Sequence, residues 1–456
     1  MKRYRWLLGC CLFLSIGMLW AADEPDLRML QQKAAQSRDM EGYVGVCKYL
    51  YQTEENPELL LLYADSIHQL ATKSKKPEQL VEYYIWASEG NFIKGDFQQG
   101  YALKRKAIAL AEKAGLKFAI SQSCCDMGYY CNVDARYDSA RYYFRKGLEA
   151  GEDLSEAGEA CRTMLTNYAS SFLFEGKTDS ALVYTIRASE RSAADKDTAM
   201  LIENLNQLGT IYRRKKDLEN CIANFEQALH LCELRGNHNA VAFIYGNIAT
   251  AYCDWNRPGD AIPFSEKAVE YALKTGNKRR IGTCYVNLGA IQTRLVQMRA
   301  EGIATLLKAI PILEEVNDRR LLCDAYNYLV NAYRMDGNLN QAMYYLQKLD
   351  KLAHEMQTDA ERFRYYQAKA GLLQESKKYT EAIIYYRRII DMLRSGYKDA
   401  RDYEHYKRLA ECYLAVNNSS QAYEYLTQAY ALRDSAFHTE QTEQLSEYSV
   451  KYQTKE

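Results

Sequence analysis

The chain lacks the features that usually divide a long sequence into separate domains. It has only six prolines among 456 residues, and no Ser/Gly-rich linker or low-complexity run interrupts it. An ordinary chain of this length would form about two or three domains. Net charge is also absent, because 59 Lys and Arg residues balance 59 Asp and Glu residues. The composition therefore gives no bulk attraction for nucleic acid or for an anionic membrane.

Catalytic and metal-binding motifs are missing as well. The six histidines are scattered, and none lies in an HExxH motif or beside a candidate nucleophile. Thirteen cysteines are present, but those beyond residue 22 show no CxxC spacing and no clustering with histidine. We therefore expect no catalytic residue, no metal site and no cofactor. We expect most of the cysteines to be small buried residues and not disulfide partners.

Long apolar runs are confined to the N-terminus. Basic residues at positions 2, 3 and 5 precede an apolar run over 7–20, and two alanines follow it. A charged start, a short apolar core and small residues at its end are typical of a secretory signal peptide. The run is shorter than the ~20 residues that span a bilayer. We therefore expect residues 1–22 to direct export to the periplasm, with an uncleaved inner-membrane anchor facing the periplasm as the alternative.

A spacing of about forty residues governs most of the remaining chain. Small residues recur at intervals of 40 or 41 from position 128 to position 410, with one valine among them. A large, usually aromatic residue follows most of them by three positions, and a second small residue follows by about twelve. A fixed period of this kind indicates a stack of identical supersecondary units. The members of the first small column are Gly128, Ala169, Gly209, Ala249, Gly289, Val330, Ala370 and Ala410.

Each repeat contains two amphipathic stretches of about four turns. In the segment 203–236, Leu205, Leu208 and Ile211 recur at helical spacing, and Phe225 belongs to the same pattern in the second stretch. Small residues where the two helices meet allow a close approach, and neighbouring aromatic side chains fill the space around that contact. Neither helix can bury its apolar stripe alone, so neighbouring pairs must stack.

These columns resemble the tetratricopeptide repeat family, whose units are helix pairs. The match is strongest at LGTIY over 208–212, followed by Cys221, Phe225 and Ala228. The common period of that family is about 34 residues, so the chain is similar to its long-helix subclass. The resemblance implies an all-α fold, an α-solenoid of helix-turn-helix repeats wound as a right-handed superhelix. It covers 77–437, which corresponds to about nine repeats of this length.

Segments outside the solenoid are assigned by pattern. Residues 23–76 are predicted to form N-terminal helices related to a degenerate repeat, and 438–456 to form one further polar helix. The ending 451–456 is similar to a sequence in exported bacterial tetratricopeptide repeat proteins, where it leads into a membrane helix and a cytoplasmic signalling output. That similarity implies the exported sensor part of a regulatory system. We expect either the sensor portion alone or a gene that has lost its output.

The first helix of each pair carries the candidate ligand-binding residues, because in this family it lines the concave groove. One column, two residues before the small position, consists of neutral amides. Amides at this place suit hydrogen bonds to an extended peptide backbone. The alternative is that they bridge adjacent repeats, since buried amides need partners in either case. The column contains Asn167, Gln207, Asn247 and Asn287.

A second column, four or five residues after the small position, contains arginines. Guanidinium forks suit carboxylates, so this column and the amides predict a groove for an acidic segment or a C-terminal carboxylate. The alternative is that these cations only favour the helix C-termini. The lysines of the carboxylate clamp found in chaperone-binding relatives are not present. The column contains Arg213, Arg214, Arg294 and Arg334.

The leading hypothesis is a non-enzymatic, exported scaffold or sensor that binds a protein or peptide in its concave groove. The alternative is a glycan-binding protein of an outer-membrane uptake system, although such proteins usually carry a lipidated cysteine and large insertions. A cytoplasmic peptide-sensing regulator is disfavoured by the N-terminal signal. An enzyme is the least favoured hypothesis, because no convergent acid, base and nucleophile can be named.

Overall fold

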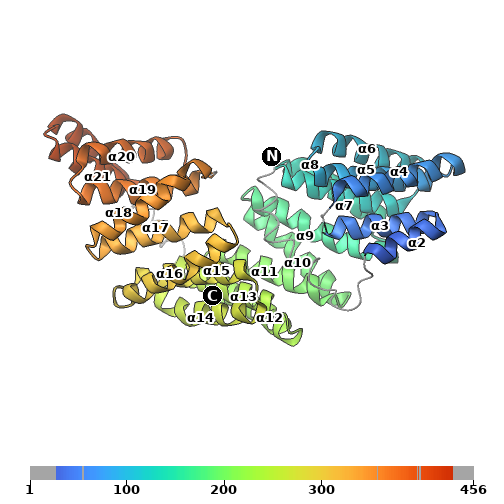
Figure 1. Cartoon of the computed structure of the whole chain (residues 1–456), viewed down its shortest axis with the longest axis horizontal. Coiled ribbons are helices and arrows are strands. Elements are labelled where there is room, and N and C mark those ends of the chain that lie inside the picture. The colour runs from blue at the N-terminus through green and yellow to red at the C-terminus, as the bar shows by residue number, and fades with distance from the viewer. Residues whose placement is uncertain (1–26, 54–55, 357, 398, 400–401, 435–456) are drawn as a thin grey trace, which may run out of the picture. The chain divides into compact units, whose positions relative to one another are not determined.

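The computed structural model describes residues 27–53, 56–356, 358–397, 399 and 402–434. The predicted signal segment 1–22 and the predicted helix 438–456 lie outside these residues. Every regular element in the described ranges is a helix (Figure 1). The chain divides after Trp255 into two compact units, which are described separately below as unit 1 and unit 2.

Unit 1 is a series of consecutive α-helices with one short 3-10 turn. The helices predicted over 23–76 belong to this unit, and they share one hydrophobic core with the two helices that follow them. Its elements are α2 (Leu27–Ser37), α3 (Met40–Thr53), α4 (Pro57–Ser74), α5 (Pro77–Lys94), α6 (Phe97–Lys113), α7 (Lys117–Val133), α8 (Tyr137–Gly151), η1 (Ser155–Ala157), α9 (Gly158–Phe174), α10 (Thr178–Ala194), α11 (Thr198–Arg214), α12 (Leu218–Leu234) and α13 (His238–Asp254).

Unit 2 repeats the same architecture. Residues 419–434 are also helical and follow the last labelled helix. Its elements are α14 (Pro258–Thr275), α15 (Lys278–Arg294), η2 (Val296–Met298), α16 (Arg299–Glu315), α17 (Arg319–Met335), α18 (Leu339–Leu352), η3 (Ala353–Glu355), α19 (Asp359–Glu375), α20 (Tyr379–Arg394) and α21 (Asp402–Ala415).

Small side chains set the contact within each helix pair. Gly209 of α11 faces Phe225 of α12, and a methyl group added to Gly209 would lie 2.6 Å from that ring. Gly289 of α15 faces Leu306 of α16 at 2.7 Å in the same way. The aromatic or leucine side chain therefore occupies the space that a larger residue in the small column would need. Ala169, which holds the same column position in α9, is fully buried.

The first helices of successive pairs also contact one another. In unit 1, α7 touches α9, α9 touches α11, and α11 touches α13, while in unit 2 α15 touches α17 and α17 touches α19. We call these helices the first-helix layer of each unit. The second helix of each pair packs against the first helix of the next pair, as α8 does against α9. The predicted all-α solenoid of stacked helix pairs is therefore confirmed.

The cysteines are part of the packing. Ten of the eleven in the described residues are buried, and Cys253 is half-buried. Burial raises the pKa of the Cys124 and Cys232 thiols to about 12. They therefore stay protonated at neutral pH and behave as small apolar side chains, as expected from the sequence. None of the described helices is both long enough and apolar enough to cross a membrane.

Candidate ligand-binding face

Polar side chains of the first-helix layer join neighbouring helix pairs in unit 1. Gln207 of α11 donates from Nε2 to the Ser170 hydroxyl of α9 at 2.8 Å. Its Oε1 accepts from the Thr185 hydroxyl of α10 at 3.4 Å. Gln207 therefore spans three helices, which is the bridging arrangement that the sequence left open as an alternative. The side chain is half-buried, so part of it still reaches solvent.

A deeper bridge lies one turn before Gln207 and was not identified from the sequence. Asn204 is fully buried. It accepts from the Thr166 hydroxyl of α9 at 2.8 Å and donates to the Ser192 hydroxyl of α10 at 3.1 Å. Both the oxygen and the nitrogen of the side-chain amide have a hydrogen-bond partner, as a buried polar group requires. This bridge fixes α11 against the preceding pair beneath the exposed surface.

Asn167, the first member of the amide column, faces the interior of unit 1. Its exposed fraction is 1%. Its backbone carbonyl accepts from Asn132 Nδ2 of α7 at 3.0 Å, while its own Oδ1 is buried and has no hydrogen-bond partner in the described structure. Asn167 therefore differs from Gln207 and Asn247, whose side chains remain partly accessible.

Asn247 of α13 pairs with Asn206 of α11, a residue outside the predicted column. Asn247 Nδ2 donates to Asn206 Oδ1 at 2.7 Å, and both side chains are half-buried. This bond uses one donor and one acceptor, so Asn206 Nδ2 and Asn247 Oδ1 remain available. If both side-chain amides were rotated by 180°, their oxygen and nitrogen atoms would exchange places, and one donor and one acceptor would still be open.

Two threonines lie on the same two helices as this amide pair. Thr210 of α11 lies four residues after Asn206 and donates to its carbonyl oxygen at 3.1 Å. Thr250 of α13 donates to the carbonyl of Gly246 at 2.8 Å. A signal for this surface exists in the sequence, because Asn206 and Gly246, like Thr210 and Thr250, are 40 residues apart. Positions 40 residues apart on α11 and α13 thus carry neutral residues in unit 1.

The two arginines predicted for this part of the groove already have partners. Arg213 Nε lies 3.5 Å from Asp254 Oδ2 of α13. Arg214 donates to the backbone carbonyl of Leu173 in α9 at 2.8 Å. Both contacts join neighbouring first helices. The exposed polar surface of α11 and α13 is therefore flanked by a compensated charge pair and not by a free cation.

Unit 2 contains the remaining predicted residues, and they differ in their surroundings. Asn287 and Arg294, both on α15, are exposed. Arg294 forms no ion pair with any other residue in the described ranges. Arg334 of α17 instead pairs with Glu375 of α19, and its Nε is buried without a partner. The same column thus contains a solvent-facing cation and a cation used to join two helices.

A buried charge cluster lies elsewhere in unit 1. Lys104 of α6 contacts both Glu89 of α5 and Asp126 of α7, and Tyr130 donates its hydroxyl to Glu89 at 2.7 Å. Burial raises the pKa of Glu89, although the nearby Lys104 opposes the rise. The cluster is enclosed by helices, and only the Asp126 side chain is appreciably exposed, at 23%. Across the described residues, no group of His, Cys, Asp and Glu is arranged to hold a metal ion.

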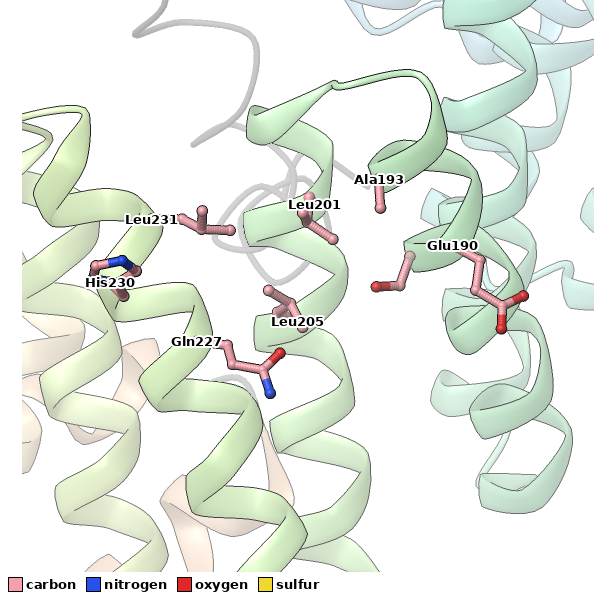
Figure 2. A pocket seen from close by; sticks show the side chains of 8 residues that line it. Glu190, Ala193, Leu201, Leu205, Gln227, His230 and Leu231 are labelled. Carbon is pink, nitrogen blue, oxygen red and sulfur yellow. The ribbon is translucent and has the colours of Figure 1, made fainter.

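A shallow apolar cleft opens between the second helices α10 and α12. Figure 2 shows Leu201 and Leu205 of α11 between Ala193 on one side and Leu231 on the other. Its volume is about 440 Å³. Exposed Glu190, Gln227 and His230 surround the apolar part of the cleft. No set of acid, base and nucleophile converges on it, so its composition gives no indication of catalysis.

Comparison with known protein families finds tetratricopeptide repeats in two segments of the chain. One tetratricopeptide repeat model matches residues 200–274, and a second matches 363–392. No curated protein sequence matches the chain.

The chain is similar to solved structures at low sequence identity. A signal transduction ATPase with a tetratricopeptide repeat sensor from Pyrococcus horikoshii is 15% identical, with a TM-score of 0.54. The match covers 85% of this chain and 54% of the ATPase, so the chain spans about half of that protein. The quorum sensor NprR from B. thuringiensis is also 15% identical, covering 77% of this chain and 97% of its own, with a TM-score of 0.47. The repeat matches show that the chain contains tetratricopeptide repeats, in agreement with the small-residue columns and the stacked helix pairs.

Proposed function

We propose that the chain is a scaffold that binds an extended peptide or a flexible protein segment on its first-helix layer. The observation that carries this proposal is the amide pair formed by Asn206 and Asn247. It offers one open donor and one open acceptor on adjacent helices, next to the hydroxyls of Thr210 and Thr250. An extended peptide backbone presents the complementary groups at regular intervals.

The predicted amide column takes part in this proposal in a modified form. Asn247 contacts the ligand directly, and Gln207 does so through the part of its side chain that is not committed to Ser170 and Thr185. Asn167 supports the layer from inside. The first-helix layer of unit 2, taken by itself, carries one exposed amide of the predicted column, Asn287 on α15.

An acidic side chain or a C-terminal carboxylate is proposed to meet Arg294 when a segment binds the first-helix layer of unit 2. This arginine is exposed and has no ion-pair partner within the described residues. Arg213, Arg214 and Arg334 already hold groups of the chain itself, so a ligand carboxylate would have to compete with those groups. Arg294 is therefore the cation of the predicted column that best suits ligand binding.

The finer biological role is also a proposal. The basic and apolar pattern of residues 1–22 supports export, and the ending 451–456 supports a sensor that belongs to a bacterial regulatory system. The NprR match has no weight for function, because its sequence identity and TM-score are too low. Fractionation of cells that express the chain with a C-terminal tag tests the location, and recovery in the cytosol would contradict export.

Cross-linking the chain in cells and identifying the attached protein tests the binding role. The affinity of that partner is then measured for the wild type, for Asn206→Ala with Asn247→Ala, and for the control Asn224→Ala. Asn224 lies on second helix α12, and among the described residues it bonds only Asn220 of its own helix. We expect the double variant to bind about three- to tenfold more weakly and the control to be unchanged. Equal affinities in all three folded proteins would contradict the proposed face.

A further inference from the structure

The apolar cleft between α10 and α12 is lined by two small residues of α10 at positions where the neighbouring repeats carry large ones. Ser189 lines the cleft, while Leu148 of α8 and Leu229 of α12 hold the equivalent repeat positions. Ala193 also lines the cleft, and the repeats before and after it carry glutamate at that position. The sequence of this one repeat therefore leaves open a space that larger side chains of the repeat pattern would occupy.

Apolar side chains around this space are incompletely covered. Leu201 of α11 and Leu231 of α12 line the cleft and are only half-buried (Figure 2). Ile186 lies one turn before Glu190 on α10, Leu234 lies one turn after Leu231 on α12, and both are exposed. Residues three or four positions apart share a helix face, so the apolar surface continues along both walls. Apolar surface gathered in this way, with polar residues at its border, is typical of an interaction site.

The only carboxylate that lines the cleft has no counter-charge. Glu190 is exposed and forms no ion pair with any other described residue. The two arginines of α10 have acidic partners of their own, since Arg187 lies 3.7 Å from Glu152 and Arg191 lies 3.0 Å from Asp195. No lysine or arginine is among the residues that line the cleft. A free carboxylate therefore stands beside open apolar surface.

We propose that this cleft is a docking site for an amphipathic helix of a partner protein, a helix whose apolar face is bordered by lysine or arginine. Its apolar side chains pack on Leu201 and Leu231, and one of its cations pairs with Glu190. A helix repeats apolar residues every three or four positions, as the walls of the cleft do, so its ridge fits the groove between α10 and α12. The inference goes beyond the proposed function, because it uses neither Asn206 nor Asn247.

Shape and charge together favour this occupant. A small-molecule site encloses about 70–90% of its ligand, whereas this cleft of about 440 Å³ has only a floor on α11 and two sides on α10 and α12. An acidic helix would bring like charges together at Glu190, while a basic helix meets an unpaired carboxylate. The apolar contacts supply the affinity, and Glu190 determines the sign of the charge that borders them.

Three synthetic peptides test the proposal on the full chain. The first is an eighteen-residue helix with leucines on one face and lysines bordering them. The second has glutamates in place of the lysines, and the third has serines in place of the leucines. Fluorescence anisotropy measures the three affinities. We expect the lysine peptide to bind, the glutamate peptide to bind at least about tenfold more weakly, and the serine peptide not to bind. Equal binding of the lysine and serine peptides would overturn docking through the apolar cleft.

Steric variants with a matched control locate the peptide. Ala193→Gln fills the cleft, whereas Ala194→Gln places the same side chain on the next residue, which is exposed and does not line it. Ser189→Leu restores the leucine of the neighbouring repeats at this position. Thermal unfolding establishes that all three variants fold. We expect Ala193→Gln and Ser189→Leu to weaken the lysine peptide by at least about tenfold, and Ala194→Gln to leave its affinity unchanged. Equal affinities in all three would overturn the placement.

A charge reversal tests the role of Glu190. Glu149 of α8 holds the equivalent repeat position and is also exposed, so Glu149→Lys is the matched control for net charge. We expect Glu190→Lys to weaken the lysine peptide by about three- to tenfold and to strengthen the glutamate peptide, while Glu149→Lys does neither. The same change in both variants would show an effect of overall charge and would overturn the pairing with Glu190.

The outcomes separate this docking site from the function proposed for the first-helix layer. Asn206→Ala with Asn247→Ala should leave the affinity of the lysine peptide unchanged, and a loss there would place the peptide on the first-helix layer instead. Sedimentation of the chain alone tests for a second copy as the occupant, and a dimer that Ala193→Gln abolishes would overturn the partner helix. If none of the three peptides binds, the docking site is wrong and the proposed function still stands.

Discussion

Lys104 of α6 donates to Asp126 of α7, with 2.9 Å between Nζ and Oδ2, and the lysine side chain has no solvent exposure. The same ammonium group contacts Glu89 of α5. Two carboxylates therefore share one cation inside unit 1. A buried charge is tolerated only when it is paired, so this one side chain ties three consecutive helices together.

Replacing the shared cation should be far more harmful than replacing one of the carboxylates. Lys104→Met leaves the buried Glu89 and the partly exposed Asp126 without a counter-charge, and we expect a loss of ~3–5 kcal/mol of stability. Glu89→Gln leaves the neutral pair of Lys104 and Asp126, so its cost should be much smaller. Hydrogen exchange of the amides in α5, α6 and α7 measures the local stability. Similar losses in both variants would show that the cluster is not held by charge.

The same cluster predicts a dependence on pH. Burial raises the pKa of Glu89 from its ordinary value of 4.5. A carboxyl group with a raised pKa in the folded state contributes most stability below pH 4.5, and it loses that contribution as the pH rises through the folded pKa. The stability of the wild type relative to Glu89→Gln should therefore decrease from pH 4 towards pH 7. Hydrogen exchange of α5 at both pH values measures it, and an increase would contradict the assignment.

Two glycines in adjacent first helices should respond oppositely to the same change. Gly209→Ala would force its new methyl group against Phe225, so we expect a loss of ~1–3 kcal/mol of stability. Gly246→Ala meets no atom of the described structure, so its higher helix propensity should stabilise by ~0.5–1 kcal/mol. Thermal unfolding measures both shifts. A destabilising effect at Gly246 would mean that an unseen contact fills that space.

The fold could be predicted from the sequence because the repeat makes the same physical demand many times. Gly209 packs against Phe225 in one helix pair, and Gly289 packs against Leu306 in another. The need for a small residue at this contact therefore recurs with the period of forty residues and can be recognised in the sequence. The candidate face was harder to predict. Periodicity places Asn167 and Asn247 in one column, but the column does not determine that Asn167 is buried while Asn247 is half-exposed.

Partner choice within the layer was also beyond the sequence. Arg294 and Arg334 belong to one predicted column, yet only Arg334 has a carboxylate, Glu375, on the next helix. The bonds of Gln207 depend on hydroxyls at Ser170 and Thr185, which come from two other helices. The sequence does not point to Asn206, because the same repeat position 40 residues later is Gly246. A glycine has no functional group, so these two positions do not form a recognisable column of polar residues.

Buried thiols should be inert in the folded protein. The pKa of Cys124 and that of Cys232 are each raised to about 12 by burial, and the thiolate is the reactive form. We expect iodoacetamide at pH 8 to modify these cysteines slowly in the native protein and rapidly in urea. Peptide mass spectrometry measures both rates. A reductant should leave the melting temperature unchanged, and a large decrease would reveal a disulfide.

The arginines of unit 2 should separate ligand binding from stability. Arg294 is exposed and has no ion-pair partner among the described residues, so Arg294→Ala should leave thermal unfolding unchanged. It should weaken an acidic peptide ligand by ~1.5–3 kcal/mol, the usual contribution of a charged hydrogen bond. Arg334→Ala removes the partner of Glu375, so it should lower the stability of unit 2 and affect binding less.

Because salt screens exposed charges, the effect of Arg294→Ala should diminish at high ionic strength. Titration calorimetry at low and high salt, with an amidated peptide as the uncharged control, measures both effects. If Arg294→Ala binds like the wild type at low salt, the acidic part of the ligand does not meet this arginine, and recognition depends on the neutral amides alone.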